Sequence, residues 1–330
     1  MDLSLIVPYH NEKYNLVILL NKVIESFKKI KKDLGFENFE LIFIDDGSDD
    51  NSTNFLVENL NKIENLEFNL KVVVYRFLKN RGQSASLSLG FNNFNGKYVA
   101  TIDSDLQNDP EDILPLLKIL VNNNLDAVSG YRKNRDEGFR VVVSNVGNFI
   151  IRIFSGYDIK DVGCSLKVYK DYVVRGLVLP FGYHRFLPII TRAHKNLVNN
   201  YPVKHYKRIY GKTHYGYSRI IWLLKNLLML WILSFYKMDK LKSKWSSVRF
   251  YFFFVIFLFT FLPLFFREIW GLSLLFLFLS FVSYSQTRGI VNFYEVFKNY
   301  DYVVVYDKEF KKKESKYMLK GGVRYEKTNS

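Results

Sequence analysis

The sequence predicts an α/β domain with a mostly parallel sheet, followed by segments that associate with a membrane. Two observations predict the domain: short aliphatic runs alternate with helix-like segments, and acidic or turn-forming residues follow several of the runs. The third observation is a pair of long uncharged runs near the C-terminus. The 330 residues are enough for about two structural units.

Five runs in the first 130 residues have the composition of buried strands. They lie at 3–7, 40–44, 71–75, 98–102 and 126–129. Apolar residues between them recur at helical spacing over 15–30 and 84–94, and Pro110 opens a further helix. Ser52 or Thr53 is the predicted N-cap of a helix after the second strand. This alternation predicts a parallel sheet with helices on both faces.

Several of these predicted strands end at residues with functional chemistry. They are Pro8, Asp45, Asp46, Asp103 and Asp105. Ligands of open α/β sheets bind at the carboxyl ends of the strands. The sequence therefore predicts a ligand site at this edge of the sheet.

Asp103, Asp105 and Gln107 carry oxygen atoms at alternate positions. In an extended segment, alternate residues face the same side, so these oxygens would converge on one hard cation such as Mg²⁺ or Mn²⁺. A solvated turn is the alternative for an Asp-x-Asp segment taken alone.

Charge and composition exclude several classes of protein. There are 47 Lys and Arg residues against 32 Asp and Glu residues, for a formal net charge of +15. A nucleic-acid-binding protein would need a recognition motif as well as charge, and the sequence contains none. A single cysteine, Cys164, excludes a disulfide framework and a cysteine-based zinc site. Basic residues facing anionic lipid are a sufficient explanation for much of the charge.

Residues 250–266 and 269–287 contain no charged residue, and Arg267 and Glu268 lie between them. As helices, the two runs would be roughly 25 and 28 Å long, close to the thickness of a bilayer core of about 30 Å. They predict a transmembrane hairpin. A pair of buried core helices is the alternative, but Phe and Leu cover every face of both runs instead of one stripe.

Basic residues flank the hairpin on both sides, and the N-terminus lacks the pattern of a signal peptide. These features predict a multi-pass protein of the cytoplasmic membrane with both termini in the cytoplasm. Residues 220–236 predict an interfacial helix, with an ordinary amphipathic core helix as the alternative. The predicted organisation is a domain at 1–216, an interfacial helix and basic linker at 217–248, the hairpin at 249–288 and a tail at 289–330. Residues 302–306 predict a short strand that docks on the domain.

Several motifs occur in order along the chain. They lie at 6–12, 44–48, 80–83, 103–111, 130–132, 139–144, 161–167, 184–188 and 208–215. Together they resemble the family 2 glycosyltransferases, whose fold is the Rossmann-like GT-A fold, over roughly residues 3–290. Within that family the set is similar to the polyprenyl-phosphate glycosyltransferases, which include dolichyl-phosphate mannosyltransferases and bacterial undecaprenyl-phosphate relatives.

The resemblance implies roles for individual residues. Those implied for the nucleotide sugar are Pro8, His10, Glu12, Asp46, Asp103 and Asp105, with Asp46 on the base or ribose. Many relatives carry Tyr where this chain has His10. Asp103, Asp105 and Gln107 would hold the metal, and Arg208 would reach the diphosphate, so that Asp103, Asp105 and Arg208 form the catalytic set. The residues implied for the acceptor phosphate are Arg132, Arg140 and Ser144.

The implied reaction transfers a sugar from a UDP- or GDP-linked donor to a polyprenyl phosphate, with inversion and with Mg²⁺ or Mn²⁺ as cofactor. A phosphate monoester is largely dianionic at neutral pH, so the acceptor would be its own nucleophile. One alternative is a processive polysaccharide synthase, whose usual Gln-x-x-Arg-Trp motif is missing here. Another is a non-catalytic membrane scaffold, which the presence of Asp105 and Gln107 disfavours. Self-association is a further property that the resemblance suggests.

Overall fold

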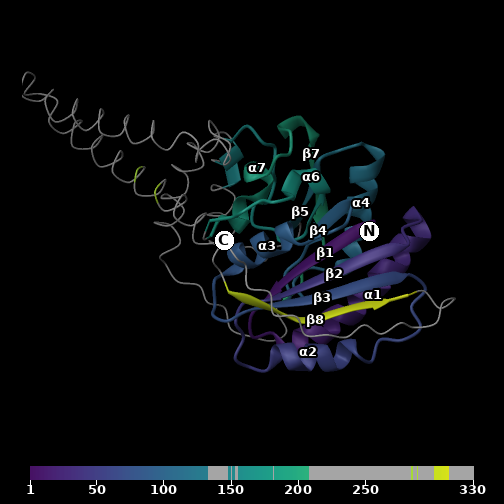
Figure 1. Cartoon of the computed structure of the whole chain (residues 1–330). Coiled ribbons are helices and arrows are strands. Elements are labelled where there is room, and N and C mark those ends of the chain that lie inside the picture. The colour runs from purple at the N-terminus through teal and green to yellow at the C-terminus, as the bar shows by residue number, and fades with distance from the viewer. Residues whose placement is uncertain are drawn as a thin grey trace, which may run out of the picture.

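The structure is a computed structural model that describes residues 1–132, 148–149, 151–152, 155–180, 182–207, 284, 288 and 301–311. The strands of this part of the chain form one sheet in the order β7-β5-β6-β4-β1-β2-β3-β8 (Figure 1). The strands are β1 Leu3–Tyr9, β2 Asn38–Asp45, β3 Asn69–Phe77, β4 Tyr98–Thr101, β5 Ala127–Arg132, β6 Lys167–Lys170, β7 Val198–Val203 and β8 Tyr302–Phe310. The helices are α1 Lys13–Leu34, α2 Ser52–Leu60, α3 Gln83–Asn92, α4 Ile113–Asn122, α6 Asp171–Val174 and α7 Leu187–Ile190. Short 3₁₀ turns are η1 Pro110–Asp112, η2 Tyr183–Phe186 and η3 Lys195–Leu197.

The sheet is mixed but mostly parallel. Strands β1 to β4 are parallel to one another, and β7 is parallel to β5. Strand β6 runs antiparallel to both of its neighbours, and β8 runs antiparallel to β3. The predicted α/β class is confirmed, and the five predicted strands correspond to β1 to β5.

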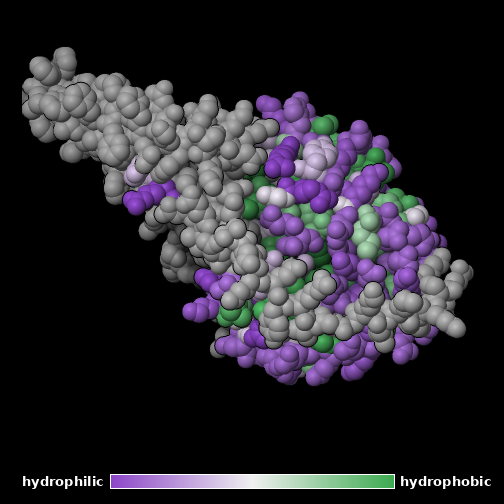
Figure 2. Space-filling model, viewed as in Figure 1, coloured by the Kyte–Doolittle hydropathy of each residue, from purple (hydrophilic) through white to green (hydrophobic). Residues whose placement is uncertain are grey.

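Helices cover both faces of the sheet, as the alternation of side chains requires. Leu3, Leu5 and Val7 of β1 are fully buried in the core that includes α1, α2 and α4. Ile6 of the same strand lies in the opposite core, with α3. Figure 2 shows that the described surface on one face is mostly hydrophilic, with hydrophobic residues visible between the polar ones. The apolar residues of the strands are thus used in two cores.

The N-cap predicted for α2 is wrong. Asn51 occupies the cap position, and both Ser52 and Thr53 lie buried within the first turn. Their hydroxyl groups are engaged elsewhere: Ser52 Oγ accepts a hydrogen bond from the backbone N–H of Glu12, and Thr53 Oγ1 donates to the carboxylate of Asp45. The two side chains therefore join the ends of β1 and β2 instead of capping their own helix.

The strand predicted at 302–306 is present and longer than expected. Strand β8 pairs with β3 along Tyr302–Phe310 and forms the edge of the sheet next to β3 (Figure 1). Phe310 is 3% exposed and belongs to the core beneath α1. The sheet therefore combines residues from both sides of segment 208–301.

Because Phe310 is buried, Phe310→Ala should destabilise the sheet domain by about 3–5 kcal/mol, the usual cost of removing a core phenylalanine. The expected result is a lower unfolding temperature in a tryptophan-fluorescence or circular dichroism melt of the full chain. Glu309→Ala is the matched control, since Glu309 is exposed on the same strand. Equal melting of the two variants would contradict the docking of β8.

Within the described residues, no helix combines the length and the apolar character needed to cross a bilayer. The predicted interfacial helix lies outside the described residues. So does the predicted hairpin, apart from Tyr284 in its second run and Arg288 just after it.

Candidate active site

The ends of β1 and β2 form one wall of the site. Asp45 and Asp46 lie there and have different hydrogen-bond partners. Asp45 is fully buried, accepts from the backbone N–H of Ser48 at 2.7 Å and pairs with Arg76 at 3.3 Å. Asp46 accepts from the backbone N–H groups of Arg81 at 2.6 Å and Gly82 at 2.8 Å. Asp45 therefore fixes its own turn, whereas Asp46 holds the loop that leads into α3.

Gly47 allows these two loops to touch. Its φ is +72°, and a Cβ there would lie 2.7 Å from the backbone nitrogen of Asn80. Only glycine meets both conditions without displacing the backbone. The contact brings the Asp-Asp-Gly-Ser segment and the Asn-Arg-Gly-Gln segment together, although their residue numbers differ by 32 between Ser48 and Asn80.

The residues implied for the nucleotide lie at this wall at different depths. Pro8 lines the cavity described below, and His10 is exposed just after β1. Glu12 is half-buried and accepts a hydrogen bond from the side-chain amide of Asn15. Asp46 is 5% exposed. The structure thus brings all four to the carboxyl ends of β1 and β2, the edge at which Asp103 and Asp105 also lie.

The segment that begins at Asp103 is a turn, not the extended strand assumed in predicting its metal ligands. Leu106 has a φ of 61°, a left-handed conformation that is uncommon for a buried leucine. The backbone N–H of Gln107 donates to Asp105 Oδ1 at 3.1 Å, which closes the turn. Strand alternation therefore cannot align Asp103, Asp105 and Gln107, and the turn itself sets their arrangement.

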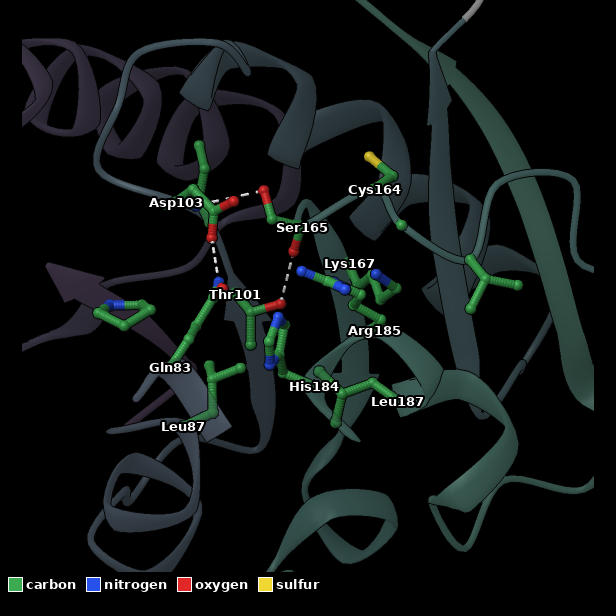
Figure 3. A pocket seen from close by; sticks show the side chains of 14 residues that line it. Gln83, Leu87, Thr101, Asp103, Cys164, Ser165, Lys167, His184, Arg185 and Leu187 are labelled. Carbon is green, nitrogen blue, oxygen red and sulfur yellow. Dashed lines mark hydrogen bonds between the residues drawn. The ribbon is translucent and has the colours of Figure 1, made fainter. Parts of the chain in front are cut away.

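Asp103 and Asp105 are nevertheless close enough to interact. Burial and, to a smaller extent, the negative charge of Asp105 together raise the pKa of Asp103 to about 6. Gln83 Nε2 donates to Asp103 Oδ1 at 2.5 Å, which orients the carboxylate (Figure 3). Two adjacent carboxylates that repel one another are the donor set that a hard divalent cation stabilises.

The donor set fits Mg²⁺ or Mn²⁺ shared with a nucleotide. The described residues contain no group of three or more His, Cys, Asp or Glu side chains that could hold a metal ion, so Asp103 and Asp105 would supply only part of a coordination shell. Mg²⁺ sites commonly use one or two carboxylates and take the remaining ligands from waters and substrate phosphates. No described contact adds the side chain of Gln107 to this set.

A cavity of about 70 Å³ opens beside Asp103. Strands β4 and β6, helix α3 and turn η2 all contribute to its wall, and Figure 3 shows Lys167, His184 and Arg185 around the space below Asp103. Burial lowers the pKa of His184 to about 3, so its imidazole is neutral at physiological pH. Its Nδ1 lies 3.1 Å from Ser84 Oγ, which anchors η2 to α3.

Ser165 connects residues 103–108, the proposed metal loop, to the loop that follows Asp161. Its hydroxyl accepts from the backbone N–H of Asp103 at 3.3 Å and donates to Asn108 at 3.1 Å. Its carbonyl accepts from Thr101 Oγ1 at 2.8 Å. These three bonds hold the loop before β6 against the end of β4.

Arg132, at the end of β5, is held by a two-pronged ion pair. Its Nε lies 2.6 Å from Asp161 Oδ2, and its Nη2 lies 2.9 Å from Asp161 Oδ1. The side chains are 14% and 8% exposed, so the pair is shielded from solvent. A guanidinium has five N–H donors, and Asp161 uses only two of them in this fork. Arg132 is thus oriented while it retains donors for an anion.

Segment 204–207 lies against the metal loop. The backbone N–H of Tyr206 donates to the carbonyl of Gln107 at 2.9 Å, and the backbone N–H of Lys204 donates to Asp112 at 2.7 Å. The chain therefore passes the metal loop immediately before Arg208. Arg208, Arg140 and Ser144 themselves lie outside the described residues.

Residues 4–177 match the family described as glycosyl transferase family 2. This span covers more than half of the chain and includes the strands from β1 to β6, whereas turn η2 follows it. The chain belongs to glycosyl transferase family 2. The mixed α/β sheet is therefore the GT-A-like sheet that the motifs predicted.

Two curated relatives of this family 2 chain are an undecaprenyl-phosphate 4-deoxy-4-formamido-L-arabinose transferase of Proteus mirabilis and a dodecaprenyl-phosphate galacturonate synthase of Rhizobium johnstonii. The first is 33% identical over 68% of this chain and 66% of its own length. The second is 32% identical over 72% of this chain and 68% of its own length. The matched part thus spans about two thirds of each relative.

Among solved structures, this family 2 chain matches glucosyl-3-phosphoglycerate synthase from Mycobacterium tuberculosis, in complex with Mn²⁺, UDP and glucosyl-3-phosphoglycerate. The TM-score is 0.45 at 16% identity, over 71% of this chain and 79% of that one. A TM-score below 0.5 does not establish a shared fold. The family assignment depends on the sequence match.

Sequence reasoning assigned no role to several residues that line the site. They are Gln83, Ser165, Lys167 and Arg185. One signal was available: Lys167 is a charged residue between the apolar Leu166 and Val168, which is unusual in a buried strand. The sequence contained no signal for the ion pair between Asp161 and Arg132, because Arg132 lies 29 residues earlier in the chain.

The pKa of Asp103 predicts how metal binding responds to pH in this family 2 site. A metal binds the ionised carboxylate, and the pKa is raised to about 6, so protons compete with the metal below that pH. The affinity for Mn²⁺ with a nucleoside diphosphate should fall roughly tenfold per pH unit below about pH 6 and level off above pH 7. Titration calorimetry between pH 5 and 8 measures this, and a constant affinity over that range would contradict it.

Proposed function

We propose that the chain is a metal-dependent, inverting glycosyltransferase that moves a sugar from a nucleoside-diphosphate donor to a polyprenyl phosphate. The observation that carries the proposal is the pair Asp103 and Asp105 at the strand ends of a family 2 chain, where Asp103 lines a cavity. The names of the two relatives, a sugar transferase on undecaprenyl phosphate and a galacturonate synthase on dodecaprenyl phosphate, support the class of acceptor. The product would be a lipid-linked monosaccharide.

On the donor side, Asp103 and Asp105 would hold Mg²⁺ or Mn²⁺, which neutralises charge on the leaving diphosphate when bound. Pro8, His10, Glu12 and Asp46 would line the nucleotide. Gln83 keeps the Asp103 carboxylate in position, and Tyr206 ties the chain ahead of Arg208 to the metal loop. Arg208 would then reach the diphosphate from that side.

On the acceptor side, the lipid phosphate is the nucleophile. Its second pKa is near 6, so it is largely dianionic at neutral pH and needs no general base. The protein must instead orient the phosphate and exclude water. Arg132, oriented by Asp161, is the described residue suited to this task, with Arg140 and Ser144 as its proposed partners. A single in-line displacement would invert the anomeric carbon.

The proposed location is the cytoplasmic membrane, with the sheet domain and both termini in the cytoplasm. The uncharged runs 250–266 and 269–287 and their basic flanks support a hairpin. The position of β8 adds support, because residues 207 and 302 belong to the same domain. Within one chain, segment 208–301 can then cross a bilayer only an even number of times. A homo-oligomer is compatible with this arrangement.

A transfer assay tests the proposal. Purified full-length protein in detergent is supplied with undecaprenyl phosphate, Mg²⁺ or Mn²⁺ and a panel of UDP- and GDP-sugars, and the lipid is analysed by mass spectrometry. The expected result is one glycosyl phospholipid that EDTA abolishes. Nucleotide binding without any lipid product across the panel would favour the non-catalytic scaffold, and a growing glycan chain would favour a processive synthase.

A further inference from the structure

A buried lysine lies at the floor of the cavity. Lys167 begins β6, pairs across the sheet with Thr101 of β4 and is 1% exposed. Figure 3 shows its side chain reaching, with that of Arg185, into the space bounded by Asp103, Ser165 and His184. Thr101 lies two residues before Asp103, so Lys167 is placed directly beneath the metal loop.

Among the residues that the structure describes, Lys167 has no counterion of its own. The nearby Asp161 carboxylate forms its ion pair with Arg132, and the nearby Asp103 carboxylate accepts from Gln83. Neither forms an ion pair with Lys167 in the part of the chain that the structure describes. Burial lowers the pKa of Lys167, although the negative charges of Asp161 and Asp103 act in the opposite direction. A buried ammonium without an ion pair is costly unless a ligand supplies the anion.

A positive charge on Lys167 would have opposite effects on the free metal ion and on the metal–nucleotide complex. A free divalent cation at Asp103 and Asp105 would be repelled by Lys167. A divalent cation with a nucleoside diphosphate carries a net negative charge, so Lys167 would attract that complex. Lysine has three N–H donors on a flexible side chain, which suits a hydrogen bond from the floor of the cavity to a phosphate oxygen.

We propose that Lys167 binds an oxygen of the donor's diphosphate and makes the site select the metal–nucleotide complex over the free metal. This inference rests on the proposed function, because it requires a nucleoside-diphosphate donor. The same phosphate chemistry is present in the acceptor lipid, so the test separates these two sources.

The test uses full-length wild type and three variants: Lys167→Met, Lys167→Arg and Lys170→Met. Methionine removes the charge at similar volume, a change that buried sites tolerate. Arginine keeps the charge. Lys170 is the control, because it lies on the same strand and donates instead to Asn124 at 2.6 Å. Calorimetry measures binding of Mn²⁺ alone and of Mn²⁺ with UDP or GDP, and steady-state assays give the KM for undecaprenyl phosphate.

We expect Lys167→Met to weaken binding of the metal–nucleotide complex at least tenfold while it binds free Mn²⁺ as tightly as wild type or more tightly. Lys167→Arg should keep affinity within about threefold, and Lys170→Met should match wild type. Unchanged nucleotide affinity in Lys167→Met would overturn the inference, as would a raised KM for the lipid alone or a parallel loss of metal and nucleotide binding. If wild type bound no nucleoside diphosphate, the proposed function itself would fail.

Discussion

Asp103→Asn and Asp105→Asn should each lower the transfer rate by about 10³-fold or more. The charge that a divalent cation requires at this turn comes from these two carboxylates, and asparagine removes it at nearly constant size. Binding of UDP or GDP in the presence of Mn²⁺ should fall with the rate. The initial rate of lipid glycosylation and a calorimetric nucleotide titration measure the two effects.

The matched control is Asp33→Asn. Asp33 forms a surface ion pair with Lys118 at 2.6 Å, far from the strand ends, so its loss should leave the rate within about twofold. Unfolding temperatures within a few degrees of wild type would show that the two site variants fold. Metal-dependent nucleotide binding that survives in both site variants would mean that the metal, if one binds, is held elsewhere.

Arg132→Lys should reduce kcat/KM for the polyprenyl phosphate by about 10²-fold, with most of the change in the lipid's KM. Lysine keeps the charge but loses the fork that lets Arg132 bind Asp161 and a phosphate together. Asp161→Asn should have an effect in the same direction, since it releases the guanidinium from the orientation set at 2.6 and 2.9 Å. Affinity for the nucleotide should stay within about twofold in both variants.

Arg152→Lys is the control for this prediction. Arg152 pairs with Asp158 at 3.4 Å, and the two side chains are 44% and 77% exposed, so the exchange should not alter kinetics. Steady-state assays with lipid and donor varied separately give the two KM values. A raised KM for the donor in Arg132→Lys, with an unchanged KM for the lipid, would mean that Arg132 binds the donor and would contradict the prediction.

The position of Asp103 and Asp105 at the edge of the sheet was predictable from sequence, because the two aspartates follow a strand. The parallel arrangement of β1, β2 and β4 then brings Asp46 and Asp103 to one edge. The arrangement of Gln107 was not predictable, because one left-handed residue, Leu106, replaces strand geometry with a turn. The spacing of hydrophobic residues in a sequence does not indicate a left-handed backbone conformation.

Strands β6 and β7 were missed for different physical reasons. Strand β6 has four residues and begins with a buried lysine, so its sequence does not have the apolar pattern that predicts a buried strand. β7 has the sequence Val-Asn-Asn-Tyr-Pro-Val at a sheet edge, where polar residues and proline are tolerated. The strand near residue 302 was visible in the sequence, but its partner β3 was not, because more than 200 residues separate them.

The most direct test of the central claim is to identify the nucleotide that is released as lipid product forms. Wild-type protein, undecaprenyl phosphate, Mn²⁺ and the donor selected from the panel are quenched at early times, and nucleotide and lipid are quantified together. The account predicts one nucleoside diphosphate per lipid and a lipid mass that increases by one sugar residue without an additional phosphate. Release of a nucleoside monophosphate, with a sugar phosphate added to the lipid, would contradict it.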